Sequence, residues 1–195
     1  MSERNISNYS QVPQIFLLIS VFRAKENRAM NVVKKIILER SVEVEVACSV
    51  KQVYDLWGNL ENVPRWIPLV KSVRRLPGDE EFWHWRFGLG FPLLTEWTSR
   101  ITRRIPLRLI AWESVSGLPN HGCAEFFPTD LGCRLRLTIA FDLPGGVLGA
   151  LLEKIGLERW LEANLVESLN RFQSQIEGEV LRQEARWGNS HHRHY

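Results

Sequence analysis

A long apolar stripe near the C-terminus constrains the fold of this 195-residue chain more than any other feature. From Leu157 to about Arg182, apolar residues recur every three or four positions, which places them along one face of an α-helix. The stripe consists of Leu157, Leu161, Leu165, Leu169, Phe172, Ile176 and Val180. A helix with one apolar face must bury that face against another layer of structure, so the rest of the chain has to supply a matching surface.

The matching surface is predicted to be an antiparallel sheet. Between Ile36 and Val46, apolar and polar residues alternate with the period of a strand that has one buried face. Six further segments with strand character follow, separated by turn residues: 70–76, 82–89, 94–104, 109–115, 122–127 and 133–141. Short strands with regular turn signals favour an antiparallel meander.

Short helices are predicted on both sides of this series of strands. Ser49 followed by Gln52 has the capping-box pattern, which predicts a helix at 50–57. A second short helix is expected at 60–66, and a third at 147–154, after a Pro-Gly-Gly turn. The order of strand, two short helices, six strands and final helices predicts an α+β fold, in which the long helix covers one face of the sheet.

The two ends of the chain fall outside this pattern. The apolar run at 15–22 is far shorter than the roughly 20 residues that span a bilayer, and basic residues follow it instead of a small-residue cleavage site. We interpret residues 1–31 as a poorly ordered extension, or as a sign that translation starts at Met30, and residues 32–182 as one domain. Residues 183–195, which contain three histidines, are predicted to be a disordered tail.

Alternation assigns one set of side chains to the face of the sheet beneath the long helix. This set combines aromatic, aliphatic and small residues: Trp85, Phe87, Trp97, Ser99, Ile101, Trp112, Ser114, Phe126, Leu137, Ile139 and Phe141. Leu161, Leu165 and Phe172 face them from the helix. Small residues among the tryptophans, Gly122 included, favour a ligand cavity in this space. The alternative is an ordinary core in which small residues complement large ones.

The opposite parity collects charged side chains. If the first strand pairs with the last, the glutamates Glu39, Glu43 and Glu45 lie across from the arginines Arg134 and Arg136, as in ordinary cross-strand ion pairs. Because such pairing accounts for the basic residues and the net charge is only +3, we expect no nucleic-acid partner.

The arginine-rich segment at 100–108 allows one further partner. Alternation places Arg100 and Arg104 on the outer face of the sheet, away from the long helix. Such a cluster is compatible with peripheral contact to an anionic membrane.

Three cysteines, Cys48, Cys123 and Cys133, are an odd number without metal-site spacing. We interpret them as buried thiols of a reducing compartment. The expected location is therefore the cytoplasm, with membrane association as an option.

Several short motifs, taken in order, resemble a known family. They are VYDLW at 53–57, ENVPRWIP at 61–68, VKSV at 70–73, His84-Trp85, Glu96-Trp97, IAWES at 110–114, Asn120-His121-Gly122, Phe126 and Pro144-Gly145-Gly146. Across residues 38–178 their order is similar to that of the polyketide cyclase/dehydrase and coenzyme-Q-binding group of the START-like (SRPBCC, Bet v 1-like) superfamily. The resemblance implies a helix-grip fold, in which a curved seven-stranded antiparallel sheet wraps around the C-terminal helix. It also implies a hydrophobic cavity with loops at its mouth, and no universal catalytic residue, because the family includes carriers, receptors and enzymes.

Motifs for a nucleophile, a phosphate loop or a metal site are absent from the sequence. We therefore predict no catalytic residue, no metal and no cofactor. Two residues are candidates for polar anchors at the mouth. His121 is placed on a mouth loop. Of the two histidines in the domain, His84 and His121, it is also the better candidate for a general base within reach of a substrate. Asn164 lies at the edge of the helical stripe, and its alternative role is on a solvated helix flank.

The favoured function is the binding, transport or chaperoning of a hydrophobic molecule such as a quinone, isoprenoid, lipid or polyketide-like compound. The first alternative is a cyclase/dehydrase-type enzyme of the aromatase kind. It would require inward-facing ionisable groups, and the strand parities supply almost none. The second alternative is a module that docks on a membrane or on a protein.

Overall fold

The computed structural model describes residues 35–90, 93–144 and 156–191. The predicted extension at 1–31 and the predicted helix at 147–154 lie outside these residues, so both stay predictions.

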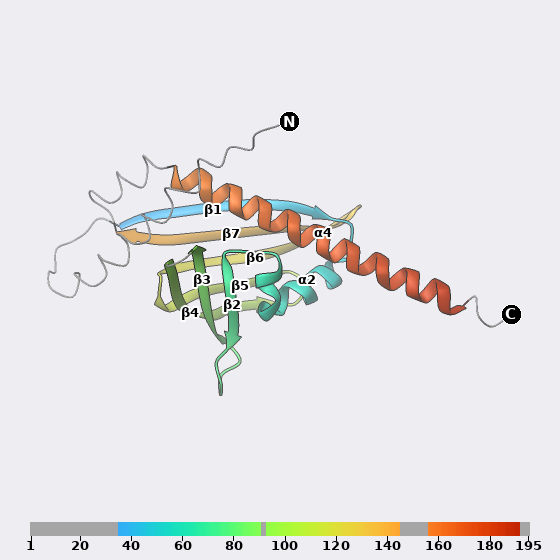
Figure 1. Ribbon diagram of the computed structural model, residues 1–195, viewed down its shortest axis with the longest axis horizontal. Coiled ribbons are helices and arrows are strands. Elements are labelled where there is room, and N and C mark those ends of the chain that lie inside the picture. Colours follow the sequence, from blue (N-terminus) through green and yellow to red (C-terminus); the bar gives the residue numbers. More distant parts are fainter. Residues whose placement is uncertain (1–34, 91–92, 145–155, 192–195) are drawn as a thin grey trace.

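One seven-stranded antiparallel sheet, two short helices and one long helix make up the described chain (Figure 1). In chain order the elements are β1 (Lys35–Val46), α2 (Val50–Gly58), the 3₁₀ helix η3 (Leu60–Arg65), β2 (Val70–Arg75), β3 (Phe82–Gly90), β4 (Leu93–Ile105), β5 (Leu109–Gly117), β6 (Asn120–Thr129), β7 (Gly132–Pro144) and α4 (Leu157–His191). Across the sheet the strand order is β1-β7-β6-β5-β4-β3-β2. The predicted α+β helix-grip fold is confirmed, and each predicted strand matches an observed one to within a few residues.

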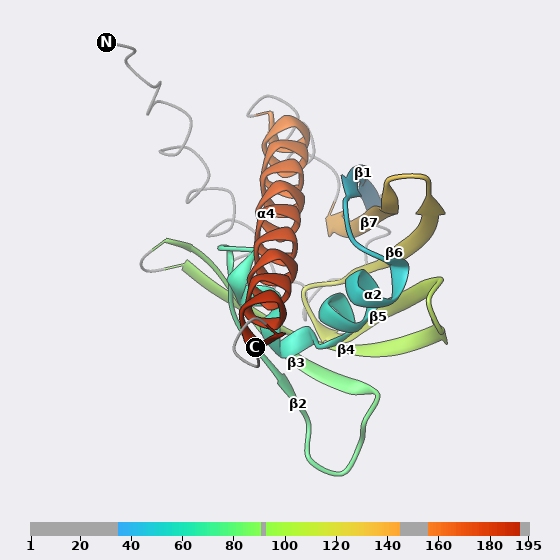
Figure 2. The ribbon, with the colours of Figure 1, turned by 90° about the vertical axis from the view of Figure 1, so that its right-hand side faces the viewer.

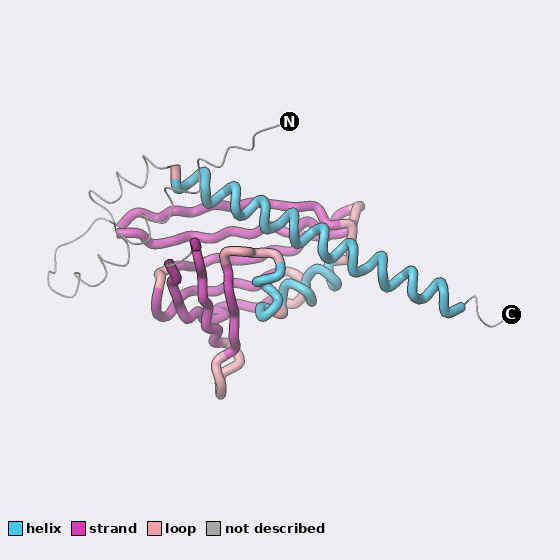
Figure 3. Tube along the Cα trace, in the orientation of Figure 1, coloured by secondary structure: helices cyan, strands magenta, loops and turns pink. Residues whose placement is uncertain are grey.

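The sheet curves around one side of α4 (Figure 2), while α2 and η3 lie at one end of the space between them (Figure 3). The start of α2 follows directly from its sequence. The Ser49 hydroxyl accepts a hydrogen bond from the backbone N–H of Gln52, and the Gln52 side chain accepts one from the backbone N–H of Ser49. This reciprocal cap satisfies two N–H groups that a helix start otherwise leaves open. The predicted second helix is a 3₁₀ helix containing Pro64, which has no backbone N–H to donate.

The outer face of the sheet carries the predicted ion pairs. In the β1–β7 register, Glu43 lies opposite Arg136 and Glu45 opposite Arg134. The Arg136 Nε to Glu43 Oε1 distance is 2.6 Å, and the Arg134 Nε to Glu45 Oε2 distance is 3.4 Å. These pairs confirm the structural interpretation of the basic residues on this face.

A β-bulge changes the parity near the end of β4. Arg100 pairs with Glu113 on the outer face, with 2.5 Å between Nη2 and Oε1. The register then shifts between Ile101 and Arg103, so that Arg104 lies opposite the buried Ile110. The assignment of Arg104 to the outer face was therefore wrong, because an extra residue in a bulge inverts the alternation beyond it.

Helix α4 is held against the rest of the fold near its start and again around Glu177 and Glu179. Near its start, Arg40 of β1 forms ion pairs with Glu158 and with Glu162, the latter at 3.8 Å. Further along, Glu177 accepts a hydrogen bond of 2.9 Å from the backbone N–H of Ala47, and Glu179 pairs with Arg65 of η3 at 2.5 Å. Between these contacts the helix passes over the sheet.

The predicted end of this helix near Arg182 was wrong. The backbone remains helical to His191, because Gln183, Glu184, Ala185 and Arg186 are all good helix formers. The predicted disordered tail at 183–195 is thus helical in backbone through His191, and residues 192–195 lie outside the described residues.

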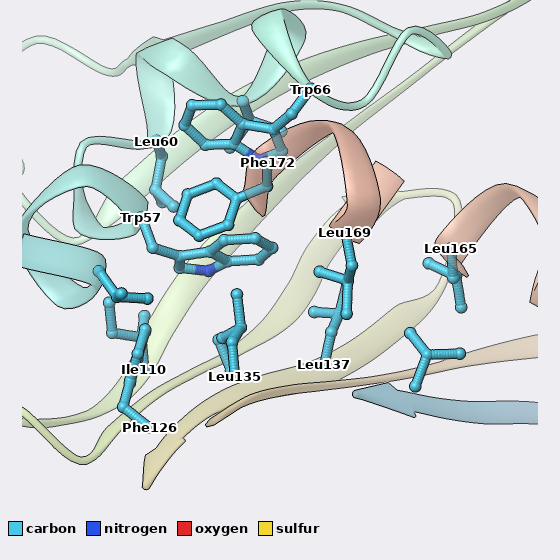
Figure 4. Packing of buried hydrophobic residues seen from close by; sticks show 14 of the residues in the cluster. Trp57, Leu60, Trp66, Ile110, Phe126, Leu135, Leu137, Leu165, Leu169 and Phe172 are labelled. Atoms are coloured by element: carbon cyan, nitrogen blue, oxygen red, sulfur yellow. The ribbon is translucent and has the colours of Figure 1, made fainter. Parts of the chain in front are cut away.

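The core at the α2 end is a cluster of three aromatic side chains. Trp57 and Trp66 stack with their ring centroids 6.0 Å apart, and Phe172 of α4 meets each of them edge-on at 5.1 Å (Figure 4). Trp66 and Phe172 are completely buried. This cluster joins both short elements to α4 and fills that end of the space.

Candidate ligand-binding cavity

A cavity of about 100 Å³ lies between the sheet and α4. The sheet contributes Val70, Trp85, Phe87, Trp97, Ile101, Ile110, Trp112, Asn120, Leu137, Ile139 and Phe141 to its lining. The α2–β2 region contributes Trp57, Leu60, Val63, Ile67 and Leu69, and α4 contributes Leu161, Asn164, Leu165 and Ser168.

Most of the residues that the sequence assigned to a cavity do line this one. They are Trp85, Phe87, Trp97, Ile101, Trp112, Leu137, Ile139, Phe141, Leu161, Leu165 and the polar candidate Asn164. The agreement arises because strand alternation and the helical stripe both identify the faces that meet. Whether these residues contact a ligand stays a prediction.

Two predicted serines are not among the lining residues and instead form hydrogen bonds within the fold. Ser99 is completely buried, and its hydroxyl accepts a 2.8 Å hydrogen bond from the indole N–H of Trp85. Ser114 accepts a 2.8 Å hydrogen bond from the backbone N–H of Asn120.

Two predicted phenylalanines belong to the packed core at the α2 end. Phe126 meets Tyr54 edge-on, with 5.1 Å between ring centroids, and Phe172 lies in the cluster with Trp57 and Trp66. Their inward orientation was predicted, but strand parity carries no information about which stretch of the inner face α2 would cover.

His121 occupies a different place from the one expected. It is exposed in β6, opposite Glu113 on one side and Ala140 on the other, and it does not line the cavity. Its neighbour Asn120 is buried and does line it. The same alternation that turns Gly122 and Ala124 inward applies to Asn120. This signal was missed because Asn120 was placed among the turn residues between the predicted strands 109–115 and 122–127.

Most of the other lining residues that were not predicted from the sequence come from η3 and the loop that follows it. Leu60, Val63, Ile67 and Leu69 lie in η3 and the loop after it, where no periodicity is long enough to define a face. Ser168 could have been found, because it lies one heptad after Leu161 on the same face of α4.

An aromatic wall forms one side of the cavity. Trp85 and Trp97 are direct cross-strand neighbours, and their rings stack 5.8 Å apart at an interplanar angle of 8°. Phe87 is tilted against Trp97 at 5.9 Å. Trp97 is buried, whereas Trp85 and Phe87 are only partly buried, so the wall offers flat apolar surface next to the hollow.

Trp112 is fixed by its neighbours. Its indole N–H donates to the side-chain oxygen of Asn120 at 3.3 Å, and the Asn120 amide nitrogen donates to the Leu118 carbonyl at 2.8 Å. Gly122 lies directly opposite Trp112, and a Cβ at this glycine would be 2.4 Å from the Thr138 carbonyl oxygen and 2.6 Å from the indole ring. The small residue at 122 therefore makes room for Trp112, so at this position small-to-large complementarity is the right interpretation.

The cavity wall is nearly free of polar groups. Among its described residues, Asn120, Asn164 and Ser168 are the polar side chains apart from the indole N–H groups, and none is ionisable. Titratable groups with shifted pKa values lie elsewhere in the described chain. Burial raises the pKa of Cys133 to about 11, and burial together with the nearby Glu125 carboxylate raises the pKa of Cys123. In the described part of the chain, no three His, Cys, Asp or Glu side chains come together in a way that could hold a metal ion.

None of the helices that the structure describes combines the length and the apolar character needed to cross a membrane.

A search among curated proteins gave no match. Solved structures share the fold at low sequence identity. The Zhui aromatase/cyclase from Streptomyces sp. R1128 has a TM-score of 0.58 and 22% identity, over 75% of this chain and 96% of that one.

Two further structures widen this group. A START superfamily protein from Mycobacterium smegmatis has a TM-score of 0.54 and 16% identity, over 72% of this chain and 98% of that one. A protein of unknown function from Staphylococcus aureus has a TM-score of 0.60 and 10% identity, over 76% and 98%. The family model described as polyketide cyclase/dehydrase and lipid transport matches residues 46–186. The chain therefore belongs to the polyketide cyclase/dehydrase and lipid transport family.

Proposed function

We propose that this protein binds a hydrophobic small molecule between the sheet and α4, and that it carries or shields this molecule without altering it. One observation supports the proposal above all: the described residues that line the cavity are apolar or neutral and include no ionisable side chain. Binding a lipophilic molecule needs apolar surface and little else. A ligand that buries about 300 Å² of apolar area gains roughly 7 kcal/mol from burial, before the entropy cost of association.

The size of the cavity bears on how such a ligand would be held. About 100 Å³ accommodates one ring or a short stretch of chain. Part of the cavity wall is only partly buried, so the space is reached from outside past some of these residues: Ile67, Leu69, Trp85, Phe87, Trp112, Ile139, Phe141 and Asn164. A quinone, isoprenoid, lipid or polyketide-like compound would place one end inside and extend past these residues.

The enzyme alternative has weaker support. Cyclisation and dehydration of a polyketide move protons, and general acid–base catalysis needs a titratable group within hydrogen-bond reach of the substrate. The described lining offers none, and His121 lies on the other face of the sheet. The similar fold of the Zhui aromatase/cyclase, at 22% identity, does not transfer its activity.

Two features support a cytoplasmic location with peripheral membrane contact as part of this proposal. The three cysteines form no disulfide with one another, which is compatible with a reducing compartment. Arg103 and Arg108 at the β4–β5 hairpin are exposed and make no ion pair with any described residue. Flotation with anionic vesicles tests the membrane contact, and equal recovery of the wild type and of a variant with both arginines changed to Gln would remove it.

Native mass spectrometry of the purified full chain, followed by solvent extraction, tests the main proposal. We expect a co-purifying apolar compound that is recovered with unchanged mass after incubation with the delipidated protein. Conversion of the extracted compound into a product by the protein would overturn the proposal in favour of an enzyme.

A further inference from the structure

Three polar side chains line the cavity, and two of them are committed to the fold. Asn120 accepts from Trp112 and donates to the Leu118 carbonyl. The Ser168 hydroxyl donates to the backbone carbonyl of Asn164 at 2.6 Å. Asn164 differs: its amide nitrogen donates one hydrogen bond of 2.8 Å to the Trp160 carbonyl, and no described residue donates to its side-chain oxygen. This amide therefore keeps an oxygen and one N–H for another partner.

The position of Asn164 makes this spare capacity relevant to a ligand. It lies on α4 between Leu161 and Leu165, which are both buried and also line the cavity. A leucine at 164 would extend the apolar surface of the helix and would favour the helix more than asparagine does. Instead, the amide of the partly buried Asn164 faces a space whose other walls are almost entirely apolar, so a hydrogen bond made there is partly shielded from water.

The remainder of the wall limits the charge of the ligand. Trp85 and Trp97 present nearly parallel rings against which a flat group can pack. No Lys, Arg or His is present among the described lining residues. A carboxylate or phosphate placed in the cavity would lose its hydration without gaining a counter-charge, which is strongly unfavourable.

We propose that Asn164 is a specificity-determining residue, which selects a neutral ligand whose apolar ring carries a carbonyl or hydroxyl group and discriminates against carboxylates. This inference rests on the proposed function and narrows its ligand class. The ring packs at the aromatic wall, and the polar group of the ligand exchanges a hydrogen bond with the Asn164 amide.

Four probes that share one ring system test the inference at neutral pH: naphthalene, 2-naphthol, methyl 2-naphthoate and 2-naphthoate. Their affinity for the full chain is measured from the quenching of tryptophan fluorescence and checked by calorimetry. We expect 2-naphthol and the methyl ester to bind about three- to tenfold more tightly than naphthalene, the range of one net neutral hydrogen bond. We expect 2-naphthoate to bind at least about 100-fold more weakly than its methyl ester, because the charge of the carboxylate is uncompensated.

The variant Asn164→Leu removes the amide and keeps the size of the side chain. It should bind naphthalene at least as well as the wild type, and it should lose the preference for 2-naphthol. The control is Asn170→Leu, an exposed position on the same helix, which should preserve the preference. Thermal unfolding of both variants verifies that they are folded.

The outcomes separate this inference from the proposed function. Equal affinity for naphthalene and 2-naphthol, an unchanged preference in Asn164→Leu, or tight binding of 2-naphthoate would overturn the role of Asn164 while leaving a binding cavity in place. If the wild type binds none of the neutral probes, the inference fails; if, in addition, no apolar compound co-purifies with the full chain, the proposed function fails as well. The selectivity of the wild type is informative by itself, so the test does not depend on the folding of any variant.

Discussion

The two ends of the space between the sheet and α4 are both rich in aromatic residues, yet one is filled and the other is hollow. At the α2 end, Trp57, Trp66 and Phe172 are in mutual contact at centroid distances of 5.1–6.0 Å. At the other end, Trp85 and Trp97 stack on each other along the sheet and leave a cavity between themselves and α4. The difference comes from the covering elements, because Trp57 and Trp66 fill the space beneath Phe172. The cavity begins beyond this cluster, with Trp57, Leu60 and Val63 on its border. Aromatic content alone does not distinguish a core from a binding site.

The largest effect is expected at the filled end. Phe172→Ala removes a completely buried ring that contacts both tryptophans, so it should lower the free energy of unfolding by about 3–5 kcal/mol. Urea denaturation followed by circular dichroism measures this. A loss below about 1 kcal/mol would mean that the cluster is not close-packed.

Truncation at the hollow end should cost less. Leu161→Ala removes a side chain that already borders empty space, so it loses fewer contacts and should cost about 2 kcal/mol, the low end for such substitutions. The same denaturation experiment gives the comparison. A loss equal to that of Phe172→Ala would show that the two ends are packed alike.

The sequence predicted the inward faces well, because alternation and helical periodicity depend on local geometry that the chain carries everywhere. Trp85, Trp97 and Leu165 were found in this way. Features that depend on a partner in space were missed. The bulge before Arg103 inverts the parity of Arg104, and Gly122 is small because Trp112 lies across from it. His121 was expected at the cavity mouth, but its neighbour Asn120 lines the cavity instead. This error has the same origin, because the start of β6 depends on its pairing with β7.

A smaller effect, carried by a residue of the packed core, should appear only at alkaline pH. Cys133 is completely buried, and burial raises the pKa of its thiol from the ordinary 9.0 to about 11. Between these values the unfolded chain releases this proton and the folded chain keeps it, so stability should fall as pH rises through this range. Unfolding curves at several pH values, compared with those of Cys133→Ala, isolate this slope. An identical slope in the variant would contradict the assignment.

The smallest effect is expected for Trp66→Phe, even though Trp66 is completely buried. No hydrogen-bond acceptor for its indole N–H is found among the described residues, so the substitution removes a buried polar group that lacks a partner. This gain offsets part of the lost contact area, and we expect a loss of about 1 kcal/mol or less, well below that of Phe172→Ala. A loss of several kcal/mol would indicate that the N–H has a partner after all.

A pair of tryptophan substitutions on α4 tests the central claim most directly. Leu165→Trp projects a large ring into the cavity, whereas Val166→Trp places the same ring on the neighbouring exposed surface. The measurement is the affinity for 2-naphthol by calorimetry. Leu165→Trp should bind 2-naphthol much more weakly than the wild type, because the new ring occupies the space between sheet and helix. Val166→Trp should bind 2-naphthol with the affinity of the wild type. Undiminished binding by a folded Leu165→Trp variant would contradict the claim that the ligand occupies this space.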